Sequence, residues 1–117
     1  MITRYAVACC LYLLGLQQSE AASFALESGN SLHALCSNPL NSPPGNSCGL
    51  YIIGAVDALL LAQDQQHRRD FCPAQEVTTG QFVGIVKNYL DAHPETWQFS
   101  ASSEIFVALK RAFPCPK

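Results

Sequence analysis

The sequence predicts a small all-α domain, a disulfide-bonded bundle of about four helices. Two observations carry this prediction. Four stretches of the chain place apolar residues at helical spacing, and none shows the strict alternation of a half-buried strand. Four cysteines, Cys36, Cys48, Cys72 and Cys115, are distributed among these stretches. An even number of cysteines in a short exported chain is typical of a disulfide framework.

The first 23 residues are expected to be a signal peptide. Arg4 precedes an apolar run, Tyr5 to Leu16, which is too short to span a bilayer as a helix. Small residues at Ser19 and Ala21, or at Ala21 and Ser23, satisfy the pattern of a cleavage site. A buried cytosolic helix is the alternative, but the run has no polar face. Residues 24–117 would then form one exported domain, without a membrane segment.

The first helix of this domain is expected to run from about Ser28 or Asn30 to Cys36. Leu32, Leu35 and Cys36 share one face of such a helix. The short amphipathic pattern predicts that this face packs on the core.

Residues 37–47 are expected to form a loop. They contain Pro39, Pro43, Pro44 and Gly45, and such residues are typical of turns and irregular segments.

The second helix is expected to begin after Ser47, its N-cap, and to end near Gln66. From Gly49 to Ala62 its only charged residue is Asp57. A helix that is apolar all round is either the centre of a bundle or shared between the core and a second molecule. These fourteen residues are too few to cross a bilayer.

The third helix has a clear start and a clear end. Thr78 and Gln81 have the spacing of a capping box. Pro94 disfavours helical geometry at His93, so the helix should end near Ala92.

The fourth helix is expected to begin after Ser100 and to end before Pro114. Glu104 in its first turn suits the helix dipole. Its buried stripe is expected to consist of Ile105, Ala108, Leu109 and Ala112.

The cysteine positions favour one disulfide pairing. In an up-and-down bundle, Cys36 and Cys48 would lie at one end, and Cys72 and Cys115 at the other. The preferred pairing is therefore Cys36–Cys48 with Cys72–Cys115. Two other connectivities stay open, because four cysteines allow three.

No constellation of residues indicates catalysis, a metal or a cofactor. His33 and Cys36 are three residues apart, but no second pair with ligand spacing follows. Asp57 needs a hydrogen-bonding partner or solvent, and a core or interface role is favoured over a catalytic acid. With a net charge of −2 and no dense basic run, the sequence does not indicate nucleic-acid binding.

Two aromatic residues lie in a segment that should be a loop. Trp97 and Phe99 follow Pro94, and each could pack into its own core or anchor a partner.

Several stretches of the chain resemble one known family. These are Leu32 with Cys36, CGLYIIGAVDA at residues 48–58, FCPAQEVTTGQFVGIVKNYLDAHPE at residues 71–95 and ALKRAFPC at residues 108–115. Together they are similar to the resistance-associated and Tai-type immunity proteins. Those proteins protect a bacterium from peptidoglycan amidases delivered by type VI secretion.

The resemblance implies a periplasmic helical protein, commonly a homodimer, that occludes the active-site cleft of a cognate amidase and has no catalytic role itself. Loops 37–47 and 93–100 are then the candidates for insertion, with Pro43, Pro44, Trp97 and Phe99 as possible partner contacts. Two other classes remain: a small periplasmic chaperone or acid-stress protein, and, less favoured, an enzyme acting on the cell wall.

Overall fold

The structure is a computed structural model, and it describes residues 27–117. Within this range the chain forms four α-helices and one short 3₁₀ helix, with no strand, so the predicted all-α fold is confirmed. An isolated antiparallel bridge joins Ser28 to Ser100. The predicted signal peptide, residues 1–23, lies outside the described residues.

Helix α2 spans Gly29–Cys36 and agrees with the expected first helix. Ser28 is its N-cap and forms a reciprocal capping box with Ser31, which satisfies two backbone N–H groups at the helix start. Leu32 and Cys36 are buried, as the amphipathic pattern predicts.

Helix α3 spans Pro43–Gln65, so it ends where expected and begins five residues earlier than expected. Its N-cap is Ser42, not Ser47, so Pro43 and Pro44 lie in its first turn instead of in a loop. Proline suits this position because the first N–H groups of a helix have no intrahelical partner. Gly45 is required here, since a Cβ would collide with the carbonyl oxygen of Pro39.

Helix α4 spans Thr79–Ala92, with the capping box of Thr78 and Gln81 as predicted. A 3₁₀ turn, η1, follows at Pro94–Thr96. Helix α5 spans Ala101–Ala112, and Ser100 caps it as expected. Ile105, Ala108 and Leu109 are buried as predicted, but Ala112, at the end of the helix, is exposed.

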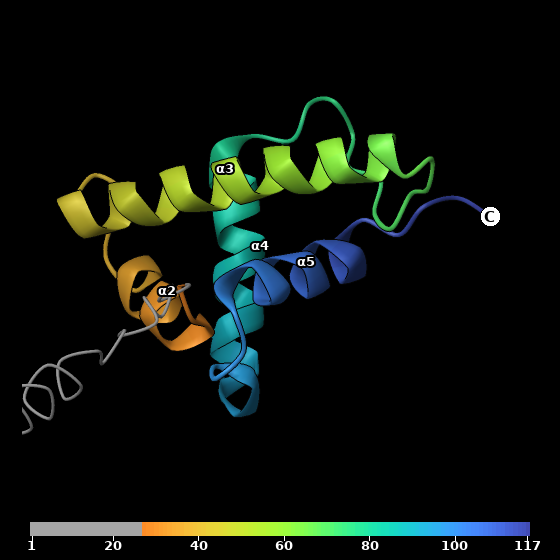
Figure 1. The fold of residues 1–117 in the computed structure, drawn as a ribbon. Helices are drawn as coiled ribbons and strands as arrows, with labels where there is room; N and C mark the ends of the chain where they lie inside the picture. The colour runs from red at the N-terminus through yellow and green to blue at the C-terminus, as the bar shows by residue number, and fades with distance from the viewer. Residues whose placement is uncertain (1–26) are drawn as a thin grey trace, which may run out of the picture.

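Each α-helix contacts the other three. Figure 1 shows α4 running across α3 and α5, with α2 at one end of α3. The up-and-down arrangement expected from the sequence is therefore wrong. Cys36 and Cys48 still meet because α2 ends beside the start of α3, and Cys72 meets Cys115 where the segments flanking α4 and α5 converge.

One buried apolar cluster draws on all four α-helices and on the segment before α4. Its members are Leu32, Cys36, Cys48, Ile52, Val56, Phe71, Phe82, Val83, Val86, Leu90, Ala101, Ile105, Ala108 and Leu109. A fully buried Leu, Ile or Phe contributes about 1.5–3 kcal/mol to folding, so this cluster dominates the stability of the domain.

Two buried polar side chains hold segments between helices. Gln63, 7% exposed, hydrogen-bonds to the backbone of Asp70 and Phe71. Glu104, 3% exposed, accepts a hydrogen bond from the hydroxyl of Thr96 over 2.7 Å. Both bonds satisfy groups that would otherwise be buried without a partner.

Candidate partner-binding site

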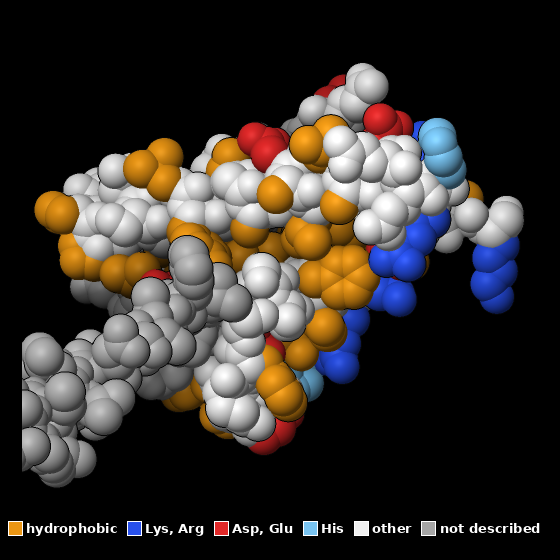
Figure 2. All heavy atoms as spheres, viewed as in Figure 1, with side chains coloured by type: hydrophobic (Ala, Val, Ile, Leu, Met, Phe, Trp, Pro, Cys, Tyr) orange, Lys and Arg blue, Asp and Glu red, His pale blue; other side chains and the backbone are white. Residues whose placement is uncertain are grey.

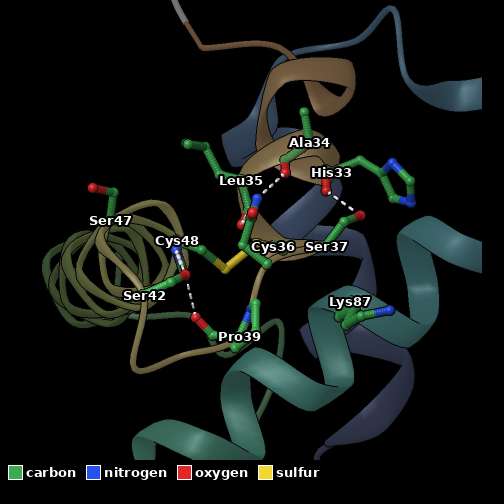
Figure 3. Close-up of a disulfide and its surroundings, with 12 residues drawn as sticks. His33, Ala34, Leu35, Cys36, Ser37, Pro39, Ser42, Ser47, Cys48 and Lys87 are labelled. Atoms are coloured by element: carbon green, nitrogen blue, oxygen red, sulfur yellow. Dashed lines mark hydrogen bonds between the residues drawn. A yellow bond between two sulfur atoms is a disulfide. The ribbon is translucent and has the colours of Figure 1, made fainter.

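Two disulfides frame the molecule and match the preferred pairing. The Cα atoms of Cys36 and Cys48 are 5.1 Å apart, and those of Cys72 and Cys115 are 4.9 Å apart. Figure 3 shows the first bridge between α2 and α3, close to the bond from the Ser42 hydroxyl to the carbonyl oxygen of Pro39. The link between α2 and α3 is thus held by a covalent bond and by the cap of α3.

One face of α3 is apolar and exposed, and we call it the α3 outer face. Leu50 and Leu61 are 68% and 57% exposed, and Gly54, Asp57 and Ala58 lie on the helix between them. A Cβ added at Gly54 would meet no described atom within 4 Å. Figure 2 shows hydrophobic side chains along α3, interrupted by acidic ones. Leu50 and Leu61 are the large apolar side chains that this face leaves accessible, on either side of the Asp57 carboxylate.

By length and hydropathy alone, α3 is long enough to cross a bilayer. It has 23 residues, with a mean hydropathy of 1.4 over its most apolar 18-residue window. This corrects the expectation of a helix too short to span. In the structure α3 contributes Cys48, Ile52 and Val56 to the core, so one face of the helix is already covered by protein.

A groove of about 890 Å³ lies between the second half of α3 and the segment that leads to α4. Its partly buried apolar residues include Ile53, Leu60 and Val77, and its charged residues are Asp57, Asp64, Arg68 and Arg69. The groove therefore combines apolar contacts with both acidic and basic side chains.

The predicted contact residues are not brought together. Pro43 and Pro44 lie in the first turn of α3, where Pro43 is exposed and Pro44 is partly buried. Trp97 is held in place: its indole N–H donates to the carbonyl oxygen of Leu90 over 2.9 Å, and its ring stacks on His33 at 4.1 Å. Phe99, by contrast, is 53% exposed.

A network of charged side chains surrounds the end of α4. Asp91 accepts hydrogen bonds from Lys87 at 2.6 Å and from His33 at 2.8 Å. These two bonds, that of Lys87 first, lower the pKa of the Asp91 carboxyl below its usual value. The network ties α4 to α2 at the surface.

A second network lies beside it. His93 bonds to Glu95 through Nδ1 at 2.9 Å, and Arg111 donates to Nε2 of His93 at 3.0 Å. The hydrogen bond from His93 is the main cause that lowers the pKa of Glu95. This network joins η1 to the last turn of α5.

Asp57 is exposed, so the apolar helix does not bury its carboxylate. Within residues 27–117, no group of three or more His, Cys, Asp or Glu side chains could hold a metal ion. The large apolar side chains exposed in this part of the chain are Leu40, Leu50, Leu61 and Phe99.

Parts of these surfaces could not be predicted from the sequence. The exposure of Leu50 and Leu61 depends on which face of α3 the other helices cover, and an all-round apolar pattern carries no signal for that face. The groove depends on the path of residues 67–77, which have no periodic pattern.

Comparison with known families gives one match. The model of the Rap1a immunity proteins matches residues 28–115. The matched region runs from the N-cap of α2 to Cys115, so it includes all the helices and both disulfides described above. No curated protein and no solved structure gives a significant match.

Proposed function

The chain belongs to the Rap1a immunity protein family, and from this membership we propose that it neutralises a peptidoglycan amidase delivered by type VI secretion. The family is one of immunity proteins, which act by binding a cognate effector. The proposed role is inhibition of that effector by occupation of its active-site cleft, without catalysis by this chain. The observation that carries the proposal is the family match over residues 28–115.

The structure offers the rigidity that an inhibitor needs. A rigid binding surface loses little conformational entropy when it enters a cleft, so more of the contact energy appears as affinity. Here two disulfides and a core that draws on every α-helix hold the surface.

Phe99 is the best candidate for a residue that enters the cleft. Its side chain is 53% exposed, while its backbone carbonyl accepts a hydrogen bond from Gly29 and its N–H donates to Thr96. An exposed aromatic ring on a fixed backbone resembles the anchors found at interface hot spots. Trp97 supports this segment from within, since it bonds to Leu90 and stacks on His33.

The α3 outer face is proposed to pair with a second copy of this chain. Leu50 and Leu61 would be covered in such a homodimer, and Gly54 would permit a close helix approach. Phe99 lies between η1 and α5, outside α3. In the proposed homodimer each copy keeps its own Phe99 contact with the effector.

The proposed location is the periplasm, reached through the signal peptide at residues 1–23. The two disulfides support an oxidising compartment, because such bridges form and persist there.

The test is a neutralisation assay. The oxidised protein, residues 24–117, would be mixed with purified peptidoglycan amidases, including any encoded beside its gene, and hydrolysis of peptidoglycan measured. One amidase should be inhibited at stoichiometric concentration, and Phe99→Ala should weaken inhibition while Gln98→Ala, an exposed neighbour, should not. Inhibition unchanged by Phe99→Ala would remove this residue from the interface.

The alternative, a periplasmic chaperone or acid-stress protein, predicts a different result in this assay and in an aggregation assay. A chaperone would suppress aggregation of several unfolded proteins at low pH and would leave folded amidases active. That pattern of results would contradict the immunity role.

A further inference from the structure

The positive charges of the domain are concentrated at one end. Residues 27–117 contain six Lys and Arg residues, and five of them lie in the segments that the second disulfide joins or in the adjoining turn of α5. Figure 2 shows Lys and Arg side chains gathered on one side of the molecule. We call this surface the basic end, and its residues are Arg68, Arg69, Lys110, Arg111 and Lys117.

The fold itself brings these charges together. Cys72 is bonded to Cys115, and the N–H of Cys72 donates to the carbonyl oxygen of Phe113 over 2.8 Å. The ring of Phe71 meets that of Phe106 edge-on at 6.3 Å, and the Lys110 ammonium lies 5.8 Å from the Phe106 ring centre. Residues 68–72 and 106–115 therefore form one continuous surface.

Few of these charges are neutralised within the domain. Arg68 pairs with Asp70 at 3.2 Å, and Arg111 donates a hydrogen bond to Nε2 of His93. Arg69, Lys110 and Lys117 form no ion pair with any residue of the described part of the chain. The sixth cation, Lys87, lies elsewhere and is paired with Asp91.

We propose that the basic end meets an acidic surface of the folded partner protein, and this rests on the proposed function. The whole chain carries a net charge of −2, so an acidic partner would be repelled by a uniform charge distribution. Concentrated at one end, the five cations attract such a partner and orient it. The groove beside them supplies apolar contact through Leu60 and Val77; Arg68 and Arg69 lie in its lining together with Asp57 and Asp64, so the unpaired Arg69, Lys110 and Lys117 carry most of the attraction.

The first experiment needs no effector. The ¹⁵N-labelled, oxidised protein is titrated at low salt with a poly-L-glutamate peptide, and amide shifts are followed by NMR. Shifts are expected at residues 67–72 and 106–115 and not along the Lys87 side of α4. Lys110→Gln should weaken the binding about two- to fivefold, the range for one exposed charge pair, and Lys87→Gln should weaken it less.

Lys87→Gln is the matched control, because both variants replace the same residue type and remove one positive charge. Equal effects of the two variants, or shifts without a common location, would overturn the proposal. So would binding to vesicles of anionic phospholipid with no response to poly-L-glutamate, since that result would assign the basic end to a lipid surface.

The second experiment uses the amidase inhibited in the neutralisation assay. Its association rate should fall about tenfold or more between 0.01 M and 0.15 M salt, as the screening length drops from about 30 Å to about 8 Å. The triple variant Arg68→Gln, Arg69→Gln, Lys110→Gln should lose most of this salt dependence. The amidase could instead be inhibited tightly with an association rate that neither salt nor the triple variant changes. That result would refute the proposed role of the basic end and leave the immunity role intact. If no amidase is inhibited, the proposed function fails, and the poly-L-glutamate titration alone decides on the basic end.

Discussion

The side chain of Gln63 holds the backbone of Phe71 through both of its polar atoms. Its Oε1 accepts a hydrogen bond from the Phe71 N–H at 2.9 Å, and its Nε2 donates to the Phe71 carbonyl oxygen at 3.3 Å. Gln63 lies near the end of α3, and Phe71 is 1% exposed. One amide thus fixes the chain reversal after α3 and places an aromatic ring in the core.

Replacing Gln63 by Leu should destabilise the domain by about 1–3 kcal/mol. The leucine has a similar size but leaves the buried backbone groups of Phe71 without a partner, and the cost is that of their desolvation. Urea unfolding of the oxidised protein measures the effect. Gln65→Leu, at an exposed position of the same helix, should change the unfolding free energy by less than about 0.5 kcal/mol.

Removing the two disulfides separately should give unequal losses. The Cys36–Cys48 bridge closes a sequence separation of 12 residues and the Cys72–Cys115 bridge one of 43. On the chain-entropy model these loops stabilise the fold by about 3 and about 4 kcal/mol, so the double Ser variant of the second pair should unfold at lower urea. A reversed order would mean that effects in the folded state outweigh loop entropy.

The domain should lose stability in acid partly through Asp91. Hydrogen bonds from Lys87 and then His33 lower the pKa of Asp91 in the folded state below its unfolded value of about 3.9. The folded state therefore binds this proton more weakly than the unfolded state. The resulting stability is present above the unfolded pKa and is lost as the pH falls through the folded pKa.

The matching measurement is the melting temperature between pH 7 and pH 2.5. Asp91→Asn should flatten the decline below about pH 4, because the carboxylate that gives rise to it is gone. Asp57→Asn is the control, since Asp57 is exposed and forms no ion pair with a described residue. An unchanged acid decline in Asp91→Asn would show that other groups cause it.

Charged substitutions on the α3 outer face should dissociate the proposed homodimer. Leu50→Glu or Leu61→Glu would place a carboxylate in an apolar contact, where its desolvation is costly. Sedimentation velocity at micromolar concentration should then show monomers, with the unfolding free energy of the monomer nearly unchanged. Gln65→Glu should stay dimeric, and a wild-type protein that sediments as a monomer would refute the dimer itself.

The sequence predicted best those features that local chemistry determines. The capping box of Thr78 and Gln81 and the stop before Pro94 are short-range signals, and α4 begins and ends where they indicate. Ser100 starts α5 for the same reason. The start of α3 was missed because Pro43 and Pro44 are common both in loops and in the first turn of a helix, and composition alone favoured the loop.

The features that depend on packing could not be predicted from single segments. Gln63 and Glu104 are polar residues on helices, and only the positions of Phe71 and Thr96 give them a buried partner. Trp97 had two open interpretations, and its packing against the core depends on the carbonyl oxygen of Leu90 and the ring of His33, which lie on other helices. The predicted disulfide pairing agrees with the structure, although the predicted up-and-down arrangement of the helices does not. The pairing requires only that the segments carrying the cysteines meet.

Helix α2 has only eight residues, a length at which an isolated helix in water is marginal. It is nevertheless fastened at both ends. Gly29 and Asn30 donate backbone hydrogen bonds to the carbonyl oxygens of Phe99 and Trp97, and Cys36 is bonded to Cys48. Such a helix cannot fray from either terminus, so its amide protons should exchange with deuterium as slowly as those of the core of α4, through global unfolding alone.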